Sequence, residues 1–216
     1  MAVFVAKAGL VLESYEEALT SPDVGSFLHP DYAGGIGTST EDTCGLPSYE
    51  HLQIIERLKG VPASWRILDV GAGSGNLKHR ARLVDITNEW IEYDTPAAVA
   101  GHSHLTDVWP SPPIDIVIFS CSLHIMPDPF AMLKQVAALH PRMVIISALP
   151  VWNNSQKVFL SVGYKFLPLW VFNRCALLLA CQPLGTVTSM WDCQNPVLIE
   201  DLDWPREGWL IERDVR

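Results

Sequence analysis

A buried-strand pattern that runs directly into a glycine-rich turn constrains this chain more than any other feature. Residues 66–75 read RILDVGAGSG, in which an aliphatic run ends at Val70 and is followed by Gly71, Gly73 and Gly75. Glycine permits the left-handed backbone and the close approach of other groups that such a turn needs. A strand, a glycine turn and a helix N-terminus in this order are typical of a nucleotide-cofactor site. A purely structural turn is the alternative.

The spacing of the glycines separates two classes of cofactor. The dinucleotide fingerprint is G-x-G-x-x-G, whose third glycine lets the helix pack closely on the strand. Here the spacing is G-x-G-x-G, and Asn76 stands where that third glycine would be. This turn, preceded by Leu68 and Asp69, resembles the first motif of class I S-adenosylmethionine-dependent methyltransferases. A nicotinamide-dependent oxidoreductase remains the weaker alternative.

The composition fits one α/β domain with short additions. The 216 residues are 49% hydrophobic, which is enough for a sizeable core. A net charge of −9 disfavours a nucleic-acid partner, because phosphate backbones would be repelled. The five cysteines have no C-x-x-C spacing, so we expect free thiols and a cytoplasmic location. The most apolar later segment, 166–181, is too short to span a membrane.

We expect the chain to divide into two parts. Residues 1–60 form an N-terminal helical extension and possible lid, with helical patterns at 14–19 and 48–59. Residues 61–216 form the cofactor-binding domain.

The second strand of that domain can be placed at either of two segments. Residues 82–86 and 90–93 compete, and we favour 90–93 because Asp94 follows it, about 20 residues beyond the glycine turn. An acidic residue there binds ribose hydroxyls in such folds, whereas Asp85 comes too early to leave room for a crossover helix. Asp94 as an ordinary surface turn residue is the alternative.

The remaining elements alternate in type along the chain. They are strands at 114–120 and 143–147, helices at 129–139 and 174–181, closing strands at 186–191 and 208–211, and a segment at 104–108 that is either the third strand or its exit. This order predicts a Rossmann-like α/β fold, with a mostly parallel, doubly wound sheet and an antiparallel C-terminal strand.

Four segments carry a closer resemblance. The sequences LDVGAGSG, WIEYDTP, IDIVIFSCSLHIMPDP and LPLWVFN are similar to those of a family of uncharacterised bacterial methyltransferases, often associated with surface-polysaccharide gene clusters. The similarity covers roughly residues 60–192. One departure is that the crossover between Gly75 and Trp90 is poor in helix-forming residues.

The resemblance implies S-adenosylmethionine as cofactor and S-adenosylhomocysteine as product. The implied cofactor-binding residues follow the ends of successive strands: Asp69, Gly71, Ala72, Gly73, Gly75, Asp94, Thr95, Asp107, Val108, Ser120, Cys121 and Ser122. For Asp107, an exposed turn position is an equal alternative.

Transfer of a methyl group to a hydroxyl would use a base. His124 is the candidate catalytic residue, because it follows the strand at 114–120 at the edge where open α/β folds bind ligands. A loop histidine that bonds a neighbouring carbonyl is the bland alternative, and His102 and His104 are weaker candidates. The histidines show no metal-ligand spacing, so we predict no metal.

The acceptor is expected to be a small molecule or a glycan. Trp170 could stack on a sugar or belong to the core. Arg174 could bind an anionic acceptor, cap a helix or pair with a carboxylate. A non-catalytic protein that binds S-adenosylmethionine is the alternative function.

Overall fold

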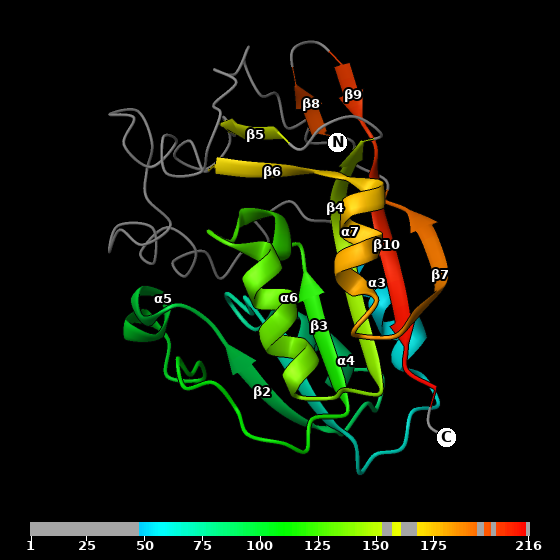
Figure 1. The fold of residues 1–216 in the computed structure, drawn as a ribbon. Coiled ribbons are helices and arrows are strands. Elements are labelled where there is room, and N and C mark those ends of the chain that lie inside the picture. The colour runs from blue at the N-terminus through cyan, green and yellow to red at the C-terminus, as the bar shows by residue number, and fades with distance from the viewer. Residues whose placement is uncertain (1–47, 153–156, 161–167, 194–196, 200–201, 215–216) are drawn as a thin grey trace.

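The computed structural model describes residues 48–152, 157–160, 168–193, 197–199 and 202–214. The expected helix at 14–19, and most of the proposed extension, lie outside these residues. The described part is a sheet with helices on both faces (Figure 1).

The helices and strands follow the expected alternation along most of the chain. In chain order they are α3 (Ser48–Leu58), β1 (Arg66–Val70), α4 (Asn76–Arg82), β2 (Glu89–Tyr93), α5 (Pro96–Gly101), β3 (Ile116–Ser120), η1 (Leu123–Ile125), α6 (Pro129–Ala138), β4 (Met143–Trp152), β5 (Lys157–Leu160), β6 (Pro168–Asn173), α7 (Arg174–Cys181), β7 (Thr186–Asp192), β8 (Val197–Ile199), β9 (Leu202–Trp204) and β10 (Arg206–Glu212). The crossover after Gly75 contains a short helix, α4, despite its poor helix-forming composition.

The main sheet has the order β2-β1-β3-β4-β10-β7. Strands β1 to β4 are parallel to one another, and β10 runs antiparallel to both β4 and β7. The predicted fold class is therefore confirmed, including the antiparallel C-terminal strand. The carboxyl ends of the parallel strands lie at one edge, toward which β3 and β4 point in Figure 1.

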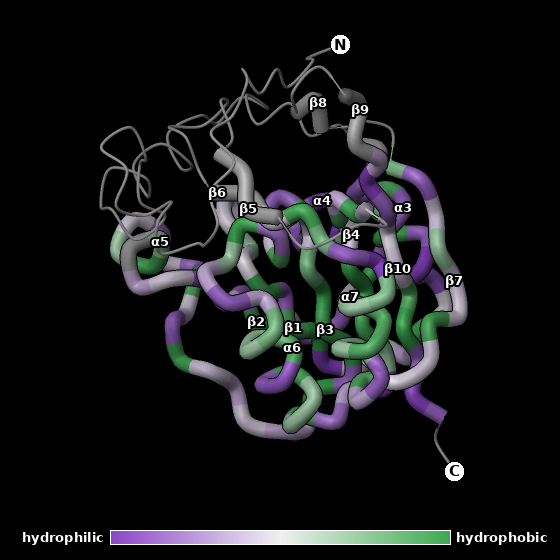
Figure 2. Tube along the Cα trace, turned by 45° about the horizontal axis from the view of Figure 1, so that its top comes forward, coloured by the Kyte–Doolittle hydropathy of each residue, from purple (hydrophilic) through white to green (hydrophobic). Residues whose placement is uncertain are grey.

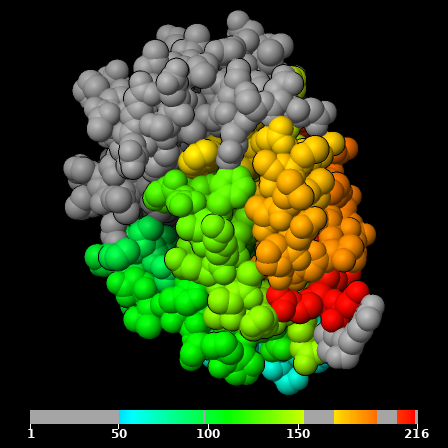
Figure 3. All heavy atoms as spheres, in the orientation of Figure 1, coloured from blue at the N-terminus to red at the C-terminus, as the bar shows by residue number. Residues whose placement is uncertain are grey.

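Each face of the sheet has its own hydrophobic core. Leu68 and Val70 of β1 pack with α6 and α7 on one face, whereas Ile67 packs with α3 and α4 on the other. This follows from the alternation of side chains along a strand. Figure 2 shows the hydrophobic residues gathered in the central strands, and Figure 3 shows α6 and α7 side by side over one face.

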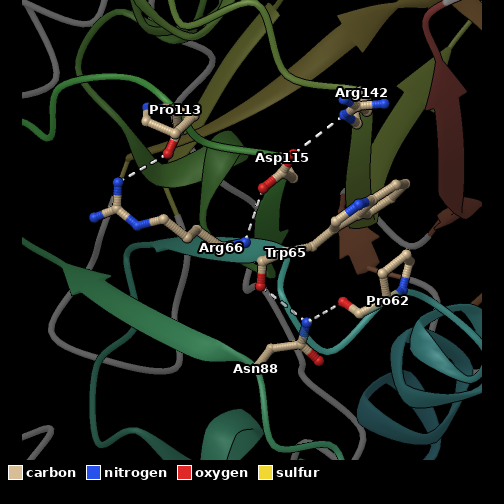
Figure 4. A network of polar contacts seen from close by, with 7 residues as sticks. All are labelled: Pro62, Trp65, Arg66, Asn88, Pro113, Asp115 and Arg142. Atoms are coloured by element: carbon tan, nitrogen blue, oxygen red, sulfur yellow. Dashed lines mark hydrogen bonds and ion pairs between the residues drawn. The ribbon is translucent and has the colours of Figure 1, made fainter.

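Polar contacts hold the amino ends of the strands together (Figure 4). The Arg66 backbone N–H donates to Asp115 Oδ2 at 3.0 Å, and Arg142 Nε donates to Asp115 Oδ1 at 3.2 Å. The Asn88 side-chain amide donates to two carbonyl groups of the loop before β1, each at 2.9 Å. These contacts stabilise the edge opposite the carboxyl ends of the strands.

A third strand at 104–108, one of the two expectations for this segment, is wrong. Only one isolated bridge forms there, between Thr106 and Tyr93 of β2. Leu105 is buried, but Asp107 and Val108 are exposed, so the segment passes the edge of the sheet once and leaves it. The prolines that follow offer no backbone N–H for further pairing.

Two other boundaries differ from the expectation. The strand expected from residue 114 begins at Ile116, and β4 continues well past Ser147 to Trp152. The extension of β4 is held by two partners, since Pro150 pairs with Arg206 of β10 and Val151 pairs with Phe172 of β6. The strand β6 and its partner β5 were not expected.

Candidate functional site

A pocket of about 220 Å³ lies at the carboxyl ends of β1 and β2, between these strands and the segment that leads from η1 into α6. Its lining consists of Val70, Gly71, Tyr93, Asp94, Thr95, Met126, Pro127, Asp128, Ala131, Met132 and Gln135. The volume is below the range of about 300–1,000 Å³ for whole small-molecule sites, so the pocket has room for only a part of a ligand of that size.

Most backbone amides of the glycine turn form hydrogen bonds within the protein. Gly71, Gly73 and Gly75 have φ angles of 75°, 55° and 73°, in the left-handed region that favours glycine. The amides of Gly71 and Ala72 both donate to the carbonyl oxygen of Tyr93, and the Gly75 amide donates to that of Ala72. The Gly73 amide donates to Asp94 Oδ2 at 2.8 Å. These four amides therefore do not form a row of free donors for an anionic pyrophosphate.

Ser122 packs against the first residue of the glycine turn. It is buried, and its hydroxyl donates to the carbonyl oxygen of Val70. A Cβ atom placed on Gly71 would lie 2.5 Å from the Ser122 Cβ. Ser122, which we expected to bind the cofactor, is thus in contact with the turn and is not among the residues that line the pocket.

Asp94 joins the turn to the end of β2 and lines the pocket. Its other carboxylate oxygen accepts from the Thr95 amide at 2.7 Å. Burial raises the pKa of Asp94, while the two backbone hydrogen bonds and the nearby His102 and His104 act in the opposite direction. An ionised carboxylate has about four lone-pair sites, so Asp94 keeps capacity for further donors.

Two more carboxylates lie under the turn, on the face that α4 covers. Asp69 and Glu92 are register partners on β1 and β2. Burial, and next the charges of Glu92 and Asp94, raise the pKa of Asp69 to about 8. Glu92 is paired with Lys78 of α4, whereas Asp69 Oδ1 has no hydrogen-bond partner among the described residues. Our sequence reasoning did not identify Glu92, although Glu92 lies two residues after Trp90 and therefore on the same face of the strand.

His104 contacts the turn from the loop after α5. Its Nε2 lies 3.3 Å from the carbonyl oxygen of Gly73, and its ring centroid lies 5.5 Å from that of His102. A Cβ atom on Gly75 would lie 3.1 Å from the same nitrogen. The two histidines are therefore beside the glycine turn and near Asp94.

Thr95, which precedes α5, is the pocket residue that follows Asp94. Thr95 caps this helix, because its hydroxyl accepts from the Ala98 amide at 3.3 Å. Asp107 and Val108 are exposed and do not line the pocket, and the Val108 amide already donates to the Thr106 hydroxyl. The charge of Asp107 contributes to a raised pKa of Tyr93, after the larger effect of burial.

The facing wall is built by the segment around α6. Asp128 caps α6 by accepting from the Ala131 amide at 2.8 Å. Trp170 Nε1 of β6 donates to the Met126 carbonyl oxygen at 2.9 Å, and the Trp170 ring packs against the core. Trp170 thus packs against the core, as one of its two interpretations expected, and its ring is partly buried. Our sequence reasoning missed Met126 and Gln135 as lining residues.

A second polar region surrounds Arg206 of β10, at the ends of β3 and β4. Arg206 donates from Nη2 to Cys121 Sγ at 3.6 Å and from Nε to the Ala148 carbonyl oxygen at 3.2 Å. His124 is buried, and burial, followed by the charge of Arg206, lowers its pKa to about 3. Its ring is therefore neutral at physiological pH and a weak proton acceptor. Its Nδ1 has no partner among the described residues, so no bond to a neighbouring carbonyl uses that atom.

Arg174 has a structural partner. Its guanidinium is paired with Glu207 of β10, and Glu207 also accepts from Trp209 Nε1 at 2.8 Å. Of the three roles considered for Arg174, the pair with a carboxylate is the one formed. It joins the start of α7 to the closing strand.

The sequence matches no protein-family model and no curated protein. Solved structures are similar in fold. The N-terminal domain of EvdMO1, solved with S-adenosylhomocysteine bound, has a TM-score of 0.57 at 12% identity, covering 89% of this chain and 99% of that chain. An S-adenosylmethionine-dependent methyltransferase from Aquifex aeolicus has a TM-score of 0.52 at 12% identity, covering 85% and 97%.

A third similar structure, from Rhodobacter sphaeroides, is described as a zinc-dependent alcohol dehydrogenase. Its TM-score is 0.54 at 13% identity, covering 85% of this chain and 97% of that chain. At these identities the comparisons show the fold alone. Among the described residues, no three or more His, Cys, Asp or Glu side chains are grouped to hold a metal ion. No helix in the described ranges is long and apolar enough to cross a membrane.

Proposed function

We propose that the protein is an S-adenosylmethionine-dependent methyltransferase. The observation that carries this proposal is the chemistry of the glycine turn. Four of its amides are occupied within the protein, and the Asp94 carboxylate lines the pocket beside it. Such surroundings favour S-adenosylmethionine over a dinucleotide, because the pyrophosphate of a dinucleotide needs free backbone donors and would be repelled by the Asp94 carboxylate.

The residues present fit such a cofactor. Asp94 would accept from the ribose hydroxyls, and the pocket between Tyr93 and Met126 would hold the nucleoside part. Gly71, Ala72 and Gly73 would lie against its sugar and methionine parts, with Asp69 behind them. The roles expected for Gly75, Thr95, Ser120 and Cys121 remain part of this proposal, whereas Asp107 and Val108 would act only at the rim.

When bound, the cofactor supplies a methyl group that its sulfonium already activates. The protein therefore has to hold donor and acceptor in line and exclude water. The carboxyl edge of β3 and β4 would hold the acceptor, because it adjoins the glycine turn on the side away from β2. The role of His124 as base remains a proposal, in which the neutral ring would accept a proton against the charge of Arg206.

We propose a small-molecule or glycan acceptor. The net charge of −9 supports this proposal, because it disfavours nucleic acid.

Calorimetric titration of two ligands into the whole chain tests the proposed function. S-adenosylhomocysteine should bind, and NADH should bind much more weakly or not at all. The reverse order of affinities would replace the methyltransferase proposal by an oxidoreductase. Absence of S-adenosylhomocysteine binding would remove the proposal.

A further inference from the structure

Three polar side chains on one face of the sheet have oxygen atoms without a hydrogen bond. Glu50 of α3 is 1% exposed, and neither of its carboxylate oxygens has a partner among the described residues. Ser147 of β4 is also 1% exposed, and its hydroxyl makes no hydrogen bond of ordinary geometry with the part of the chain that the structure describes. The hydroxyl of Ser120, at the end of β3, is buried and likewise has no partner within the described ranges.

These three side chains belong to the same layer. Ser120 and Ser147 are register partners in neighbouring parallel strands. They share the strand face of Ile118 and Ile145, which pack in the core under α3 and α4. Glu50 lies one turn before Ile54, which packs in that same core, so the Glu50 side chain is directed to this face.

The surroundings of Cys193 show that Glu50 lies near Ser147 of β4. The Cys193 thiol is buried, and both the Ser147 hydroxyl and the Glu50 charge are close enough to influence its pKa. Glu50 therefore lies near the Ser147 end of the layer. Arg206 also lies near Cys193, but its Nε and Nη2 atoms are directed to Ala148 and Cys121.

This layer adjoins the glycine turn. Asp69 of β1 pairs with Ile118 of β3, so Ser120, two residues later, is level with Gly71. Neighbouring strands are about 4.8 Å apart, so the two serines lie roughly one and two strand spacings from the turn. The two serines are therefore neighbours of the turn on the face that α3 and α4 cover.

The unpartnered atoms indicate which kind of group would bind to them. A carboxylate buried without a partner is costly, and a cation or a strong donor removes that cost. A hydroxyl can direct its lone pairs to a ligand. If both serines do so, all three side chains act as hydrogen-bond acceptors toward that ligand. An ammonium group carries one positive charge and three N–H donors, which matches one carboxylate and two hydroxyls.

We propose that Glu50, Ser120 and Ser147 form a binding site for a protonated amino group of a ligand. The inference rests on the proposed function, in which two ligands are present. The amino group belongs either to the methionine part of the donor or to the acceptor.

The first experiment compares two nucleosides by calorimetry. S-adenosylhomocysteine carries the amino-acid part, and 5′-methylthioadenosine lacks it. Each is titrated into wild type, Glu50→Gln and the control Glu56→Gln, which changes an exposed glutamate of the same helix. If the site holds the donor's amino group, Glu50→Gln weakens S-adenosylhomocysteine at least tenfold and leaves 5′-methylthioadenosine unchanged. The control leaves both affinities unchanged.

The second experiment covers the acceptor. Propylammonium is titrated against propanol by two-dimensional amide NMR, into wild type and Glu50→Gln, with and without S-adenosylhomocysteine. Binding of propylammonium to wild type that Glu50→Gln abolishes assigns the site to an acceptor amine. Unchanged S-adenosylhomocysteine affinity together with no such amine binding would overturn the proposal. If neither nucleoside binds wild type, the proposed function fails, but the NMR series without nucleoside still decides whether an ammonium site exists.

A structural role for Glu50 would give a different result. Because the carboxylate has no partner, Glu50→Gln should leave the thermal midpoint of the free protein unchanged or raise it. A clear fall in the midpoint would contradict the proposal. Ser147→Ala, measured in the same titrations, supplies the affinity comparison if Glu50→Gln does not fold, and equal affinities in wild type and Ser147→Ala would then overturn the proposal.

Discussion

Asp69 makes the stability of this protein depend on pH. Its folded pKa of about 8 lies above the unfolded value near 4, so between these values the folded state binds more protons than the unfolded state. Stability should therefore fall as the pH rises through that range. The lowered pKa of His124 acts with the opposite sign, but only up to about pH 6.5.

The window from pH 6.5 to 8 isolates the effect of Asp69. The free energy of unfolding of wild type should fall there by up to about 2 kcal/mol, at most ~1.4 kcal/mol per pH unit. Asp69→Asn should flatten this dependence, whereas Asp85→Asn, at an exposed position, should behave as wild type. Urea unfolding at four pH values measures it. An equal slope in Asp69→Asn and wild type would show that Asp69 is ionised when folded.

Gly71 should be intolerant of any side chain. Its φ of 75° is strained for alanine, and the new Cβ would clash with Ser122. Gly71→Ala is therefore expected to cost about 2–4 kcal/mol of unfolding free energy, combining backbone strain and overpacking. Gly60→Ala is the matched control, because Gly60 has a φ of 86° but no atom within 4 Å of an added Cβ. Equal losses in urea unfolding would show that Ser122 moves aside freely.

At the scale of elements, the sequence predicted the helices and strands whose boundaries depend on residues nearby in the chain. The first strand ends at a glycine turn, and α6 starts at Pro129 after its cap Asp128, so both boundaries followed from the sequence. Asp94 was found by its distance from the turn. The strand β6 depends on pairing with β4 and β5, and the isolated bridge at Thr106 depends on the edge of β2. Such pairings leave no local pattern.

In the candidate site, too, features set by nearby residues could be predicted and features set by distant segments could not. The glycines and Asp94 could be identified from spacing, because their roles depend on the backbone of one turn. Burial of His124 and Ser122 depends on segments that are distant in the sequence, and neither could be predicted. The pairing of Arg174 with Glu207 likewise joins residues 33 positions apart.

Trp170 of β6 supports the wall of the pocket from outside it. Trp170→Phe removes the donor to the Met126 carbonyl and should cost about 1 kcal/mol of unfolding free energy. It should also weaken S-adenosylhomocysteine binding severalfold, because Met126 lines the pocket. Trp90→Phe is the control, since the Trp90 indole N–H has no partner among the described residues and Trp90 does not line the pocket. Unchanged affinity in Trp170→Phe would show that β6 does not position Met126.

At the scale of the whole molecule, the two faces of the sheet have different roles in this account. The face under α6 and α7 holds the larger core and the pocket beside Asp94, where we propose that the nucleoside part binds. The face under α3 and α4 carries the buried carboxylates Asp69, Glu92 and Glu50. Both meet at the carboxyl edge, where the glycine turn lies. The contacts in Figure 4 stabilise the opposite edge, so variants of the site can be made without disturbing them.

The most direct test of the central claim is the affinity of S-adenosylhomocysteine for wild type, Asp94→Asn and Asp85→Asn, measured by calorimetry. Asp85 is the matched control, because it is the exposed aspartate that competes for the end of the second strand in the sequence. We predict binding to wild type and Asp85→Asn with equal affinity, and a loss of about tenfold to a hundredfold in Asp94→Asn, as expected for hydrogen bonds to a charged group. Equal affinity in all three proteins would contradict the assignment of Asp94, and absence of binding to wild type would contradict the cofactor itself.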